Sequence, residues 1–224
     1  MLFLVDGTKK IIFGWSAKCG CSHIKNIYWF LQNGNIDNII HTSNDNCKLP
    51  DDLTDYTTII IIRNPFKRIV SGFLDKYKKD GSFRKYWKYD NITFSMFINE
   101  IEKKNWKMID KHHFTPQTTE QFNDKIFESK NIKFFDIENI DYEYIEKLYN
   151  IDIPEIILNK KQGHERQKYD KDITTYVYDM NLDDYIFNNI DIKYFYNEEL
   201  KNKICEIYKN DFILFKKYGF DFTI

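Results

Sequence analysis

The chain has 224 residues and a formal net charge of −1, and 30% of its residues are charged while 42% are hydrophobic. This length suits a single domain over residues 1–224, because chains usually divide only above roughly 250 residues. The composition excludes a disordered or fibrous protein. The chain has 33 Lys and Arg against 34 Asp and Glu, so it has no overall positive charge. We therefore expect no nucleic-acid partner, and any anion site should be local.

No segment predicts export or membrane insertion. The longest apolar runs are Met1–Val5 and Ile59–Ile62, far shorter than the ~20 residues of a membrane helix. The N-terminus lacks a basic region followed by a long apolar stretch, so we expect no signal peptide. The cysteines are too few and too scattered for a disulfide framework, and the first two lack zinc spacing: Cys19, Cys21, Cys47 and Cys205. We therefore expect a reduced, cytoplasmic protein without a membrane span.

The first predicted unit is a strand, a loop of small residues and a helix. Lys10–Phe13 indicates a short buried strand, and the loop runs from Gly14 to Ser22. Apolar side chains then recur with the i, i+3, i+4, i+7 spacing of one helix face. They are Ile24, Ile27, Tyr28 and Leu31.

The second unit repeats this plan. Thr57–Ile62 is a β-branched run typical of a fully buried parallel strand. Asn64 predicts a helix N-cap and Pro65 the first helical residue. The buried face of this helix is expected to carry Ile69, Val70, Phe73, Leu74 and Tyr77.

A third strand is predicted over Ile132–Ile137, after a helical stretch that begins near Thr119. Strands that alternate with helices predict a three-layer α/β domain, with a central parallel sheet flanked by helices. The aromatic and basic stretch Lys78–Lys111 indicates either amphipathic helices that pack on the sheet or a wall that binds an acceptor. The chain is predicted to close with one long helix that carries Leu200, Ile204, Ile207, Tyr208, Leu214 and Phe215.

The loop Lys18–Ser22 has the features of an anion site. Backbone N–H groups at a helix N-terminus, a lysine and small residues that permit close approach form a phosphate cradle. It is not a Walker loop, because its lysine precedes the glycine and the pattern Gly-x4-Gly-Lys-Ser/Thr is absent. The alternative interpretation is an ordinary strand–helix turn.

Arg63 follows the second predicted strand, at the edge where open α/β sheets bind ligands. Ser71 lies two turns into the next helix, off its apolar stripe, and Lys67 lies on the same face. An arginine and a serine suit a phosphate monoester, since they supply one forked cation and one hydroxyl donor. The alternative is that Arg63 only forms a salt bridge at the end of the strand and that Ser71 is a solvated helix position.

The two sites belong to a longer pattern. Ile12–Lys25 contains Lys-Cys-Gly-Cys-Ser after a strand, and Ile60–Tyr77 contains Arg-Asn-Pro-Phe-Lys-Arg-Ile-Val-Ser. Four further segments follow in order: Phe94–Phe97, His113–Gln117, Phe135–Glu138 and Tyr208–Tyr218. Together they resemble the membrane-bound, Golgi-type carbohydrate sulfotransferases of sulfotransferase family 2, over nearly the whole chain.

This resemblance implies a core similar to that of P-loop nucleotide kinases and a donor, 3′-phosphoadenosine 5′-phosphosulfate, whose sulfuryl group passes in line to a hydroxyl. It places Lys18 at the bridging oxygen of the phosphosulfate, as a catalytic residue, and implies no metal. Arg63 and Ser71 would hold the 3′-phosphate. The 5′-phosphate would be cradled by Cys19, Gly20, Cys21 and Ser22.

A general base must take the proton of the acceptor hydroxyl. We expect His41, which follows the predicted strand end Ile39-Ile40 and lies between the two donor motifs. Related glycan sulfotransferases place a catalytic histidine in this region, and the pKa of histidine suits the task. His113 is the second candidate and Glu138 the third, and a plain surface position is the alternative for His41.

The chain departs from the family at Phe114, where the family has Trp, and at Asn64, where it has Asp. We also expect no N-terminal membrane anchor of the kind that the family carries. A basic cluster lies where the family has a loop that closes over the nucleotide, and a solvated charge run is its alternative interpretation. The cluster consists of Lys160, Lys161, His164, Arg166 and Lys168.

The predicted function is transfer of sulfate to a carbohydrate hydroxyl, with protein tyrosine as the alternative acceptor. Two other classes stay open. A binding module for the donor nucleotide would keep Arg63 and Ser71, but replacement of His41 would change nothing. A kinase of small metabolites would depend on Mg²⁺ and would normally carry the Walker lysine and serine that this loop lacks.

Overall fold

The computed structural model describes residues 1–34, 47–118, 124–158 and 171–224. The chain divides into two compact units. Unit 1 consists of residues 1–63 and 117–165, and unit 2 of residues 64–116 and 166–224. The single domain expected from the length stays a prediction.

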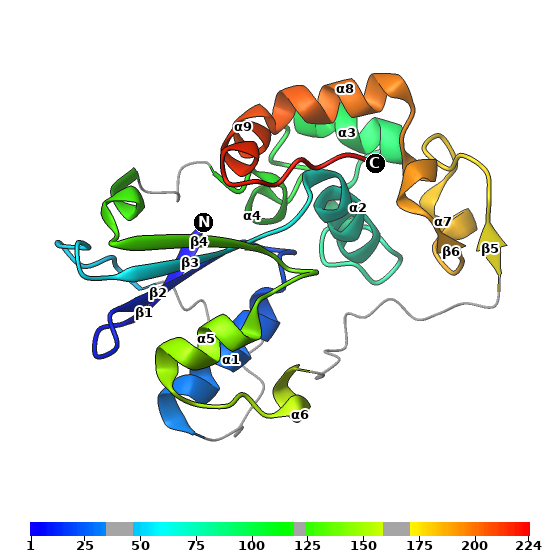
Figure 1. The fold of residues 1–224 in the computed structure, drawn as a ribbon. Coiled ribbons are helices and arrows are strands. Elements are labelled where there is room, and N and C mark those ends of the chain that lie inside the picture. Colours follow the sequence, from blue (N-terminus) through cyan, green and yellow to red (C-terminus); the bar gives the residue numbers. More distant parts are fainter. Residues whose placement is uncertain (35–46, 119–123, 159–170) are drawn as a thin grey trace. The chain divides into compact units, whose positions relative to one another are not determined.

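Unit 1 is built on a four-stranded sheet in the order β1-β2-β3-β4 (Figure 1). The strands are β1 (Leu2–Asp6), β2 (Ile11–Trp15), β3 (Thr57–Ile62) and β4 (Asn131–Asp136). β3 runs parallel to both β2 and β4, whereas β1 runs antiparallel to β2. The three predicted strands and the α/β class are therefore confirmed, but the sheet is mixed rather than wholly parallel.

The strand β1 was missing from the sequence prediction. Its turn into β2 is closed by Asp6, whose carboxylate accepts hydrogen bonds from the backbone N–H groups of Thr8 and Lys9, each at 2.9 Å. An aspartate that binds the backbone two and three residues later is a common turn former. A tight turn returns the chain antiparallel to itself, so this short apolar run becomes an edge strand.

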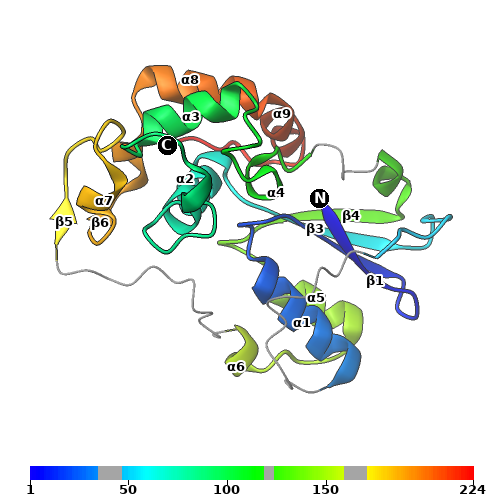
Figure 2. The same ribbon diagram turned by 180° about the vertical axis from the view of Figure 1, so that it is seen from behind.

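Three helices pack against the same face of the sheet in unit 1 (Figure 2). They are α1 (Cys21–Asn33), α5 (Tyr142–Tyr149) and α6 (Glu155–Leu158). Ile24, Ile27 and Leu31 of α1 are buried there, as their spacing predicted, and Tyr28 is partly buried against the same cluster. The helical stretch expected near Thr119 begins outside the described residues, and its described part is the 3-10 turn η2 (Asp124–Glu128).

Unit 2 is mostly helical, with a separate aromatic core. Its helices are α2 (Pro65–Lys76), α3 (Phe94–Glu102), α4 (Lys111–Phe114), α7 (Leu182–Tyr185), α8 (Glu198–Ile207) and α9 (Lys209–Lys217). Its shorter elements are the 3-10 turns η1 (Arg84–Tyr86) and η3 (Ile192–Phe195) and the parallel pair β5 (Asp172–Ile173) and β6 (Asn189–Ile190).

The start of α2 confirms its predicted cap. The Asn64 side chain accepts a hydrogen bond from the Phe66 N–H at 2.9 Å, and Pro65 is the first helical residue. The whole predicted apolar face is buried in the core of unit 2: Ile69, Val70, Phe73, Leu74 and Tyr77. Local sequence therefore determines where this helix begins and which way it faces.

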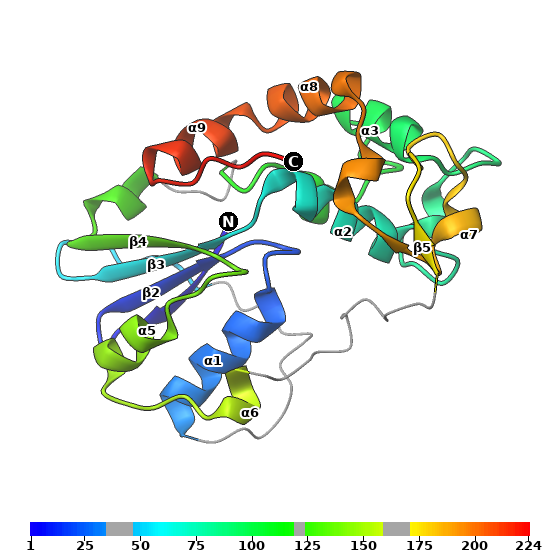
Figure 3. The same ribbon diagram turned by 45° about the vertical axis from the view of Figure 1, so that its right-hand side comes forward.

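The predicted long C-terminal helix is wrong, because the chain forms two helices, α8 and α9, which Figure 3 shows as separate coils. The break falls at Tyr208, whose backbone leaves the helical region at φ −107° and ψ 22°. Its buried hydroxyl donates a hydrogen bond of 2.5 Å to the carbonyl of Phe114. Neither Gly nor Pro marks the break, so helical periodicity could not reveal it.

The aromatic stretch 78–111 divides between core and surface. Trp87 is buried in the core of unit 2, and Phe83 and Trp106 pack partly against it. Tyr86 and Tyr89 are exposed. Core packing therefore accounts for three of these aromatic side chains. That this stretch binds an acceptor stays a prediction, and it now concerns the two exposed tyrosines.

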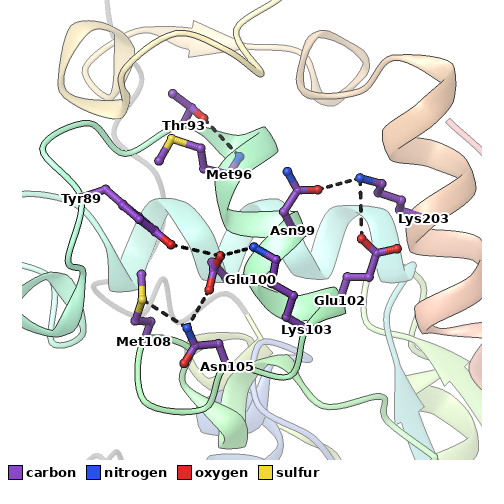
Figure 4. Close-up of polar contacts among 10 residues, drawn as sticks. All are labelled: Tyr89, Thr93, Met96, Asn99, Glu100, Glu102, Lys103, Asn105, Met108 and Lys203. Carbon is purple, nitrogen blue, oxygen red and sulfur yellow. Dashed lines mark hydrogen bonds and ion pairs between the residues drawn. The ribbon is translucent and has the colours of Figure 1, made fainter.

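A buried carboxylate organises the C-terminal end of α3 (Figure 4). Glu100 accepts hydrogen bonds from Lys103 Nζ at 2.9 Å, Asn105 Nδ2 at 2.6 Å and Tyr89 Oη at 3.4 Å. Burial opposes the ionisation of Glu100, but the hydrogen bonds from Lys103, Asn105 and Tyr89 outweigh it and lower its pKa. The ionised form therefore stabilises this part of unit 2.

Replacing Glu100 with glutamine is expected to reduce the free energy of unfolding at pH 7 by ~1.5 kcal/mol, the value of a hydrogen bond to a charged group. A carboxyl with a lowered pKa stabilises the fold above its unfolded pKa, and this contribution is lost as the pH falls through the folded pKa. Urea unfolding from pH 7 to pH 3 should show a smaller difference between wild type and Glu100→Gln at the acid end. A difference in unfolding free energy that stays constant from pH 7 to pH 3 would contradict the stabilising role of ionised Glu100.

Candidate functional site

The loop between β2 and α1 has an unusual backbone. Lys18 and Gly20 adopt left-handed conformations, with φ of 66° and 69°. The N–H of Cys19 donates to the carbonyl of Ser16 at 3.1 Å, and the first α1 bond runs from the Ile24 N–H to the carbonyl of Gly20 at 3.0 Å. The N–H groups of the first helical turn have no acceptor within the helix. Such a turn is suited to an anion.

Two features of the structure favour glycine at position 20. Its φ of 69° disfavours any residue with a side chain, and an added Cβ would lie 2.2 Å from Ile137 Cδ1 and 2.8 Å from Ile137 Cγ1. Ile137 directly follows β4, and its N–H bonds to the carbonyl of Ile62 at 2.9 Å. The backbone of the loop at Gly20 therefore packs directly against the Ile137 side chain.

Replacing Gly20 with alanine is expected to cost about 2–4 kcal/mol of unfolding free energy, from left-handed backbone strain and overpacking together. Gly34 is the matched control, because it ends the same helix with a φ of 68° but has nothing within 4 Å of an added Cβ. Gly34→Ala should cost only the backbone strain, about 1–2 kcal/mol. Urea unfolding of both variants measures the difference, and equal losses would contradict the role of Ile137.

Arg63 lies where β3 ends and contacts the loop. Its Nη1 donates a hydrogen bond of 3.0 Å to the carbonyl of Lys18. β2 and β3 are parallel neighbours, with Gly14 opposite Ile60, so their carboxyl ends meet at one edge of the sheet. Unit 1 therefore brings together the loop and the arginine that the sequence assigned to two different phosphates.

Gln117 joins the same group of residues and had no assigned role in the sequence prediction. Its Oε1 accepts from the Arg63 N–H at 3.1 Å, and its Nε2 donates to the Arg63 carbonyl at 2.9 Å. Cys19 Sγ donates to the same Oε1 at 3.0 Å. The only signal in the sequence was the place of Gln117 in the segment His113–Gln117.

A model of the sulfotransferase family matches residues 1–219 of the 224. The chain belongs to the sulfotransferase family. No curated protein and no solved structure matches this sulfotransferase significantly. The family resemblance inferred from the motifs is therefore confirmed, and with it a general capacity for sulfuryl transfer to a hydroxyl-bearing acceptor.

The other residues that were predicted to bind the donor lie in both units. Ser22 is buried in the first turn of α1, and Cys21 begins that helix, partly exposed. Ser71 lies in unit 2, half-buried on α2, with Lys67 one turn before it. The proposed base His41 lies outside the described residues, as does the basic cluster Lys160, Lys161, His164, Arg166 and Lys168.

The second candidate base, His113, is paired with a carboxylate in unit 2. Its Nδ1 lies 2.7 Å from Oδ2 of Asp110. Burial opposes the ionisation of Asp110, but the hydrogen bond and charge of His113 outweigh it and lower the Asp110 pKa. A carboxylate on Nδ1 orients the ring and leaves Nε2 as the basic nitrogen. The third candidate, Glu138, is exposed.

Two buried donors hold the segment that carries His113. Arg68, which is 1% exposed, donates from Nη1 to the carbonyl of Thr115 at 2.9 Å, and Tyr208 donates to Phe114 as described above. The sequence predicted neither of these hydrogen bonds, although it placed Tyr208 on the last helix. Phe114 itself is fully buried, so an apolar ring at the family's Trp position retains a packing role.

Two further findings concern cofactors and membranes. Across residues 1–34, 47–118, 124–158 and 171–224, no three His, Cys, Asp or Glu side chains gather closely enough to hold a metal ion. That the reaction needs no metal stays a prediction. None of the helices formed by the described residues has the length and apolarity that a membrane crossing needs.

Proposed function

We propose that this sulfotransferase moves a sulfuryl group from 3′-phosphoadenosine 5′-phosphosulfate to a hydroxyl of a carbohydrate. The observation that carries the proposal is the hydrogen bond from Arg63 Nη1 to the Lys18 carbonyl. It joins the two residues that the motifs assign to opposite ends of one nucleotide. A donor with phosphates at its 3′ and 5′ positions fits such an arrangement, because it presents an anion to each residue.

Each donor-binding residue has a distinct role in this proposal. The loop residues Cys19 and Gly20 and the first helical residues Cys21 and Ser22 cradle the 5′-phosphate, chiefly through backbone N–H groups at the start of α1. Arg63 and Ser71 bind the 3′-phosphate. Lys18 contacts the bridging oxygen, where negative charge grows as the S–O bond to the phosphate breaks, and one such donor contributes ~3 kcal/mol to the transition state.

A histidine receives the proton of the acceptor hydroxyl as the new S–O bond forms. We propose His41 for this role, from its place between the two donor motifs. His113 is the second candidate, supported by its contact with Asp110. Replacing each with alanine distinguishes them, because loss of the base lowers turnover while donor binding persists.

The acceptor class rests on the family resemblance and on exposed aromatic side chains. Tyr86 and Tyr89 are exposed among lysines, and flat rings of this kind stack on sugars. A protein tyrosine is the alternative acceptor. The cytoplasmic location expected from the sequence stays a prediction.

The deciding experiment is calorimetric titration of the full chain with 3′-phosphoadenosine 5′-phosphate, beside ATP with Mg²⁺ and AMP. Micromolar binding of the bisphosphate alone supports the proposed donor. A preference for ATP with Mg²⁺ would instead indicate a kinase. Binding of the bisphosphate without any transfer, unaffected by His41→Ala, would indicate a binding module.

A further inference from the structure

We propose that Gln117 is a positioning residue that couples the Lys18 loop to Arg63, so that the two phosphate-binding groups of the donor site move as one. This inference rests on the proposed function, because it assumes that the donor binds at the loop and Arg63. It assigns to Gln117 no contact with the donor. The residues that carry it, Cys19, Arg63 and Gln117, all belong to unit 1.

The side-chain amide of Gln117 acts on the Arg63 backbone as a neighbouring strand would. It accepts from the N–H and donates to the carbonyl of the same residue, at 3.1 and 2.9 Å. Two such bonds to one residue form the closed pair seen between antiparallel strands. They fix the backbone of Arg63 just beyond the end of β3, and therefore fix where its guanidinium begins.

The same oxygen of Gln117 also receives the Cys19 thiol, at 3.0 Å. Cys19 is fully buried and follows Lys18 in the loop. Arg63 is also connected to the loop directly, through its hydrogen bond to the Lys18 carbonyl. A displacement of Gln117 must therefore disturb both the loop and the arginine.

Burial makes this arrangement sensitive to chemistry at position 117. Gln117 is 1% exposed, so a group that loses its partner there cannot turn to water. The site needs an acceptor toward Cys19 and the Arg63 N–H, and a donor toward the Arg63 carbonyl. Of the isosteric residues, glutamine satisfies both, whereas an ionised glutamate presents an oxygen to that carbonyl.

The test uses Gln117→Leu and Gln117→Glu, with calorimetric titration of 3′-phosphoadenosine 5′-phosphate at pH 8 and pH 5.5. Gln117→Leu should weaken binding about tenfold at both values, the equivalent of one net hydrogen bond. Gln117→Glu should weaken binding of the bisphosphate about tenfold at pH 8, and most of this affinity should return at pH 5.5. Burial raises the pKa of a carboxyl, and a protonated glutamate supplies the missing donor. Each affinity is divided by that of the wild type at the same pH, which removes the titration of the ligand itself.

Gln32→Glu is the matched control. Gln32 is also in unit 1 and donates from Nε2 to Asp6 Oδ2 at 2.5 Å, near the far end of α1. The substitution makes the same chemical change beside a carboxylate and lowers stability, but its affinity for the bisphosphate should equal that of the wild type at both pH values. A pH-dependent loss of affinity in this control would attribute the effect to stability and overturn the inference.

Cys19 provides a second, independent arm. Cys19→Ala should weaken binding in the wild-type background but add nothing in the Gln117→Leu background, because both changes remove the same connection. Cys19→Ser keeps a donor toward Gln117, so it should bind more tightly than Cys19→Ala. If the losses of affinity from Cys19→Ala and Gln117→Leu add in the double variant, the proposed coupling is overturned.

The outcomes separate the inference from the proposed function. If the wild type binds the bisphosphate and folded Gln117→Leu binds it equally well, the coupling is wrong and the donor site stands. If the wild type does not bind the bisphosphate, the proposed donor is wrong and the coupling role is overturned with it. If the affinity of Gln117→Glu returns at pH 5.5, the result supports both the proposed donor and the coupling role of Gln117. It also shows that the variant is folded.

Discussion

Arg63→Ala is expected to weaken binding of 3′-phosphoadenosine 5′-phosphate by ~1.5–3 kcal/mol, about 10- to 150-fold. The substitution removes the charged group proposed for the 3′-phosphate. It also removes the hydrogen bond to the Lys18 carbonyl, so the loop proposed to hold the 5′-phosphate loses one of its contacts. Calorimetric titration measures the loss, and AMP, which lacks the 3′-phosphate, should be affected far less.

Two variants sharpen this result. Arg63→Lys keeps the charge but not the planar fork, so it should bind with intermediate affinity. Arg84→Ala is the control, since Arg84 lies in unit 2 and pairs with Asp183 at 2.8 Å at the surface. An exposed pair contributes little to stability, and its loss should leave binding unchanged. Unaltered binding by folded Arg63→Ala would remove Arg63 from the 3′-phosphate site.

Lys18→Ala is expected to lower kcat by about 100-fold, which corresponds to the ~3 kcal/mol of one transition-state donor. Affinity for the bisphosphate should fall much less, because the contact proposed for Lys18 would strengthen only as charge develops on the bridging oxygen. The measurement is steady-state release of the bisphosphate, with a carbohydrate that the wild type accepts. The result separates a catalytic lysine from one that only binds the donor.

The left-handed backbone of Lys18 determines the control for this variant. Alanine keeps the Cβ, so Lys18→Ala retains the same backbone strain at φ 66°. Lys10 is a second lysine of unit 1 with positive φ, 57°, and it lies over the Tyr56 ring in the turn before β2. Lys10→Ala should leave kcat unchanged. A raised KM with an unchanged kcat in Lys18→Ala would place Lys18 outside the chemistry.

The candidate site was only partly predictable from the sequence. Its loop, its arginine and their assignment to two phosphates came from motifs, because a small-residue loop before a helix and an arginine after a buried strand are local patterns. The contact between Arg63 and Lys18 was not visible, although both residues were named. Gln117 had no role at all, since its partners lie 54 and 98 residues away in the chain.

Sequence alone determined the α/β class, the bounds of β3, the start of α2 and the family of the chain. Each depends on neighbouring residues: a β-branched run forms a buried strand, and Asn64-Pro65 caps a helix. Only the tertiary structure decided that β1 completes a mixed sheet, that Tyr208 divides the last helix and that Ile137 crowds a side chain at position 20. In these cases the deciding contact joins residues far apart in the chain, and its energy exists only once the fold has brought them together.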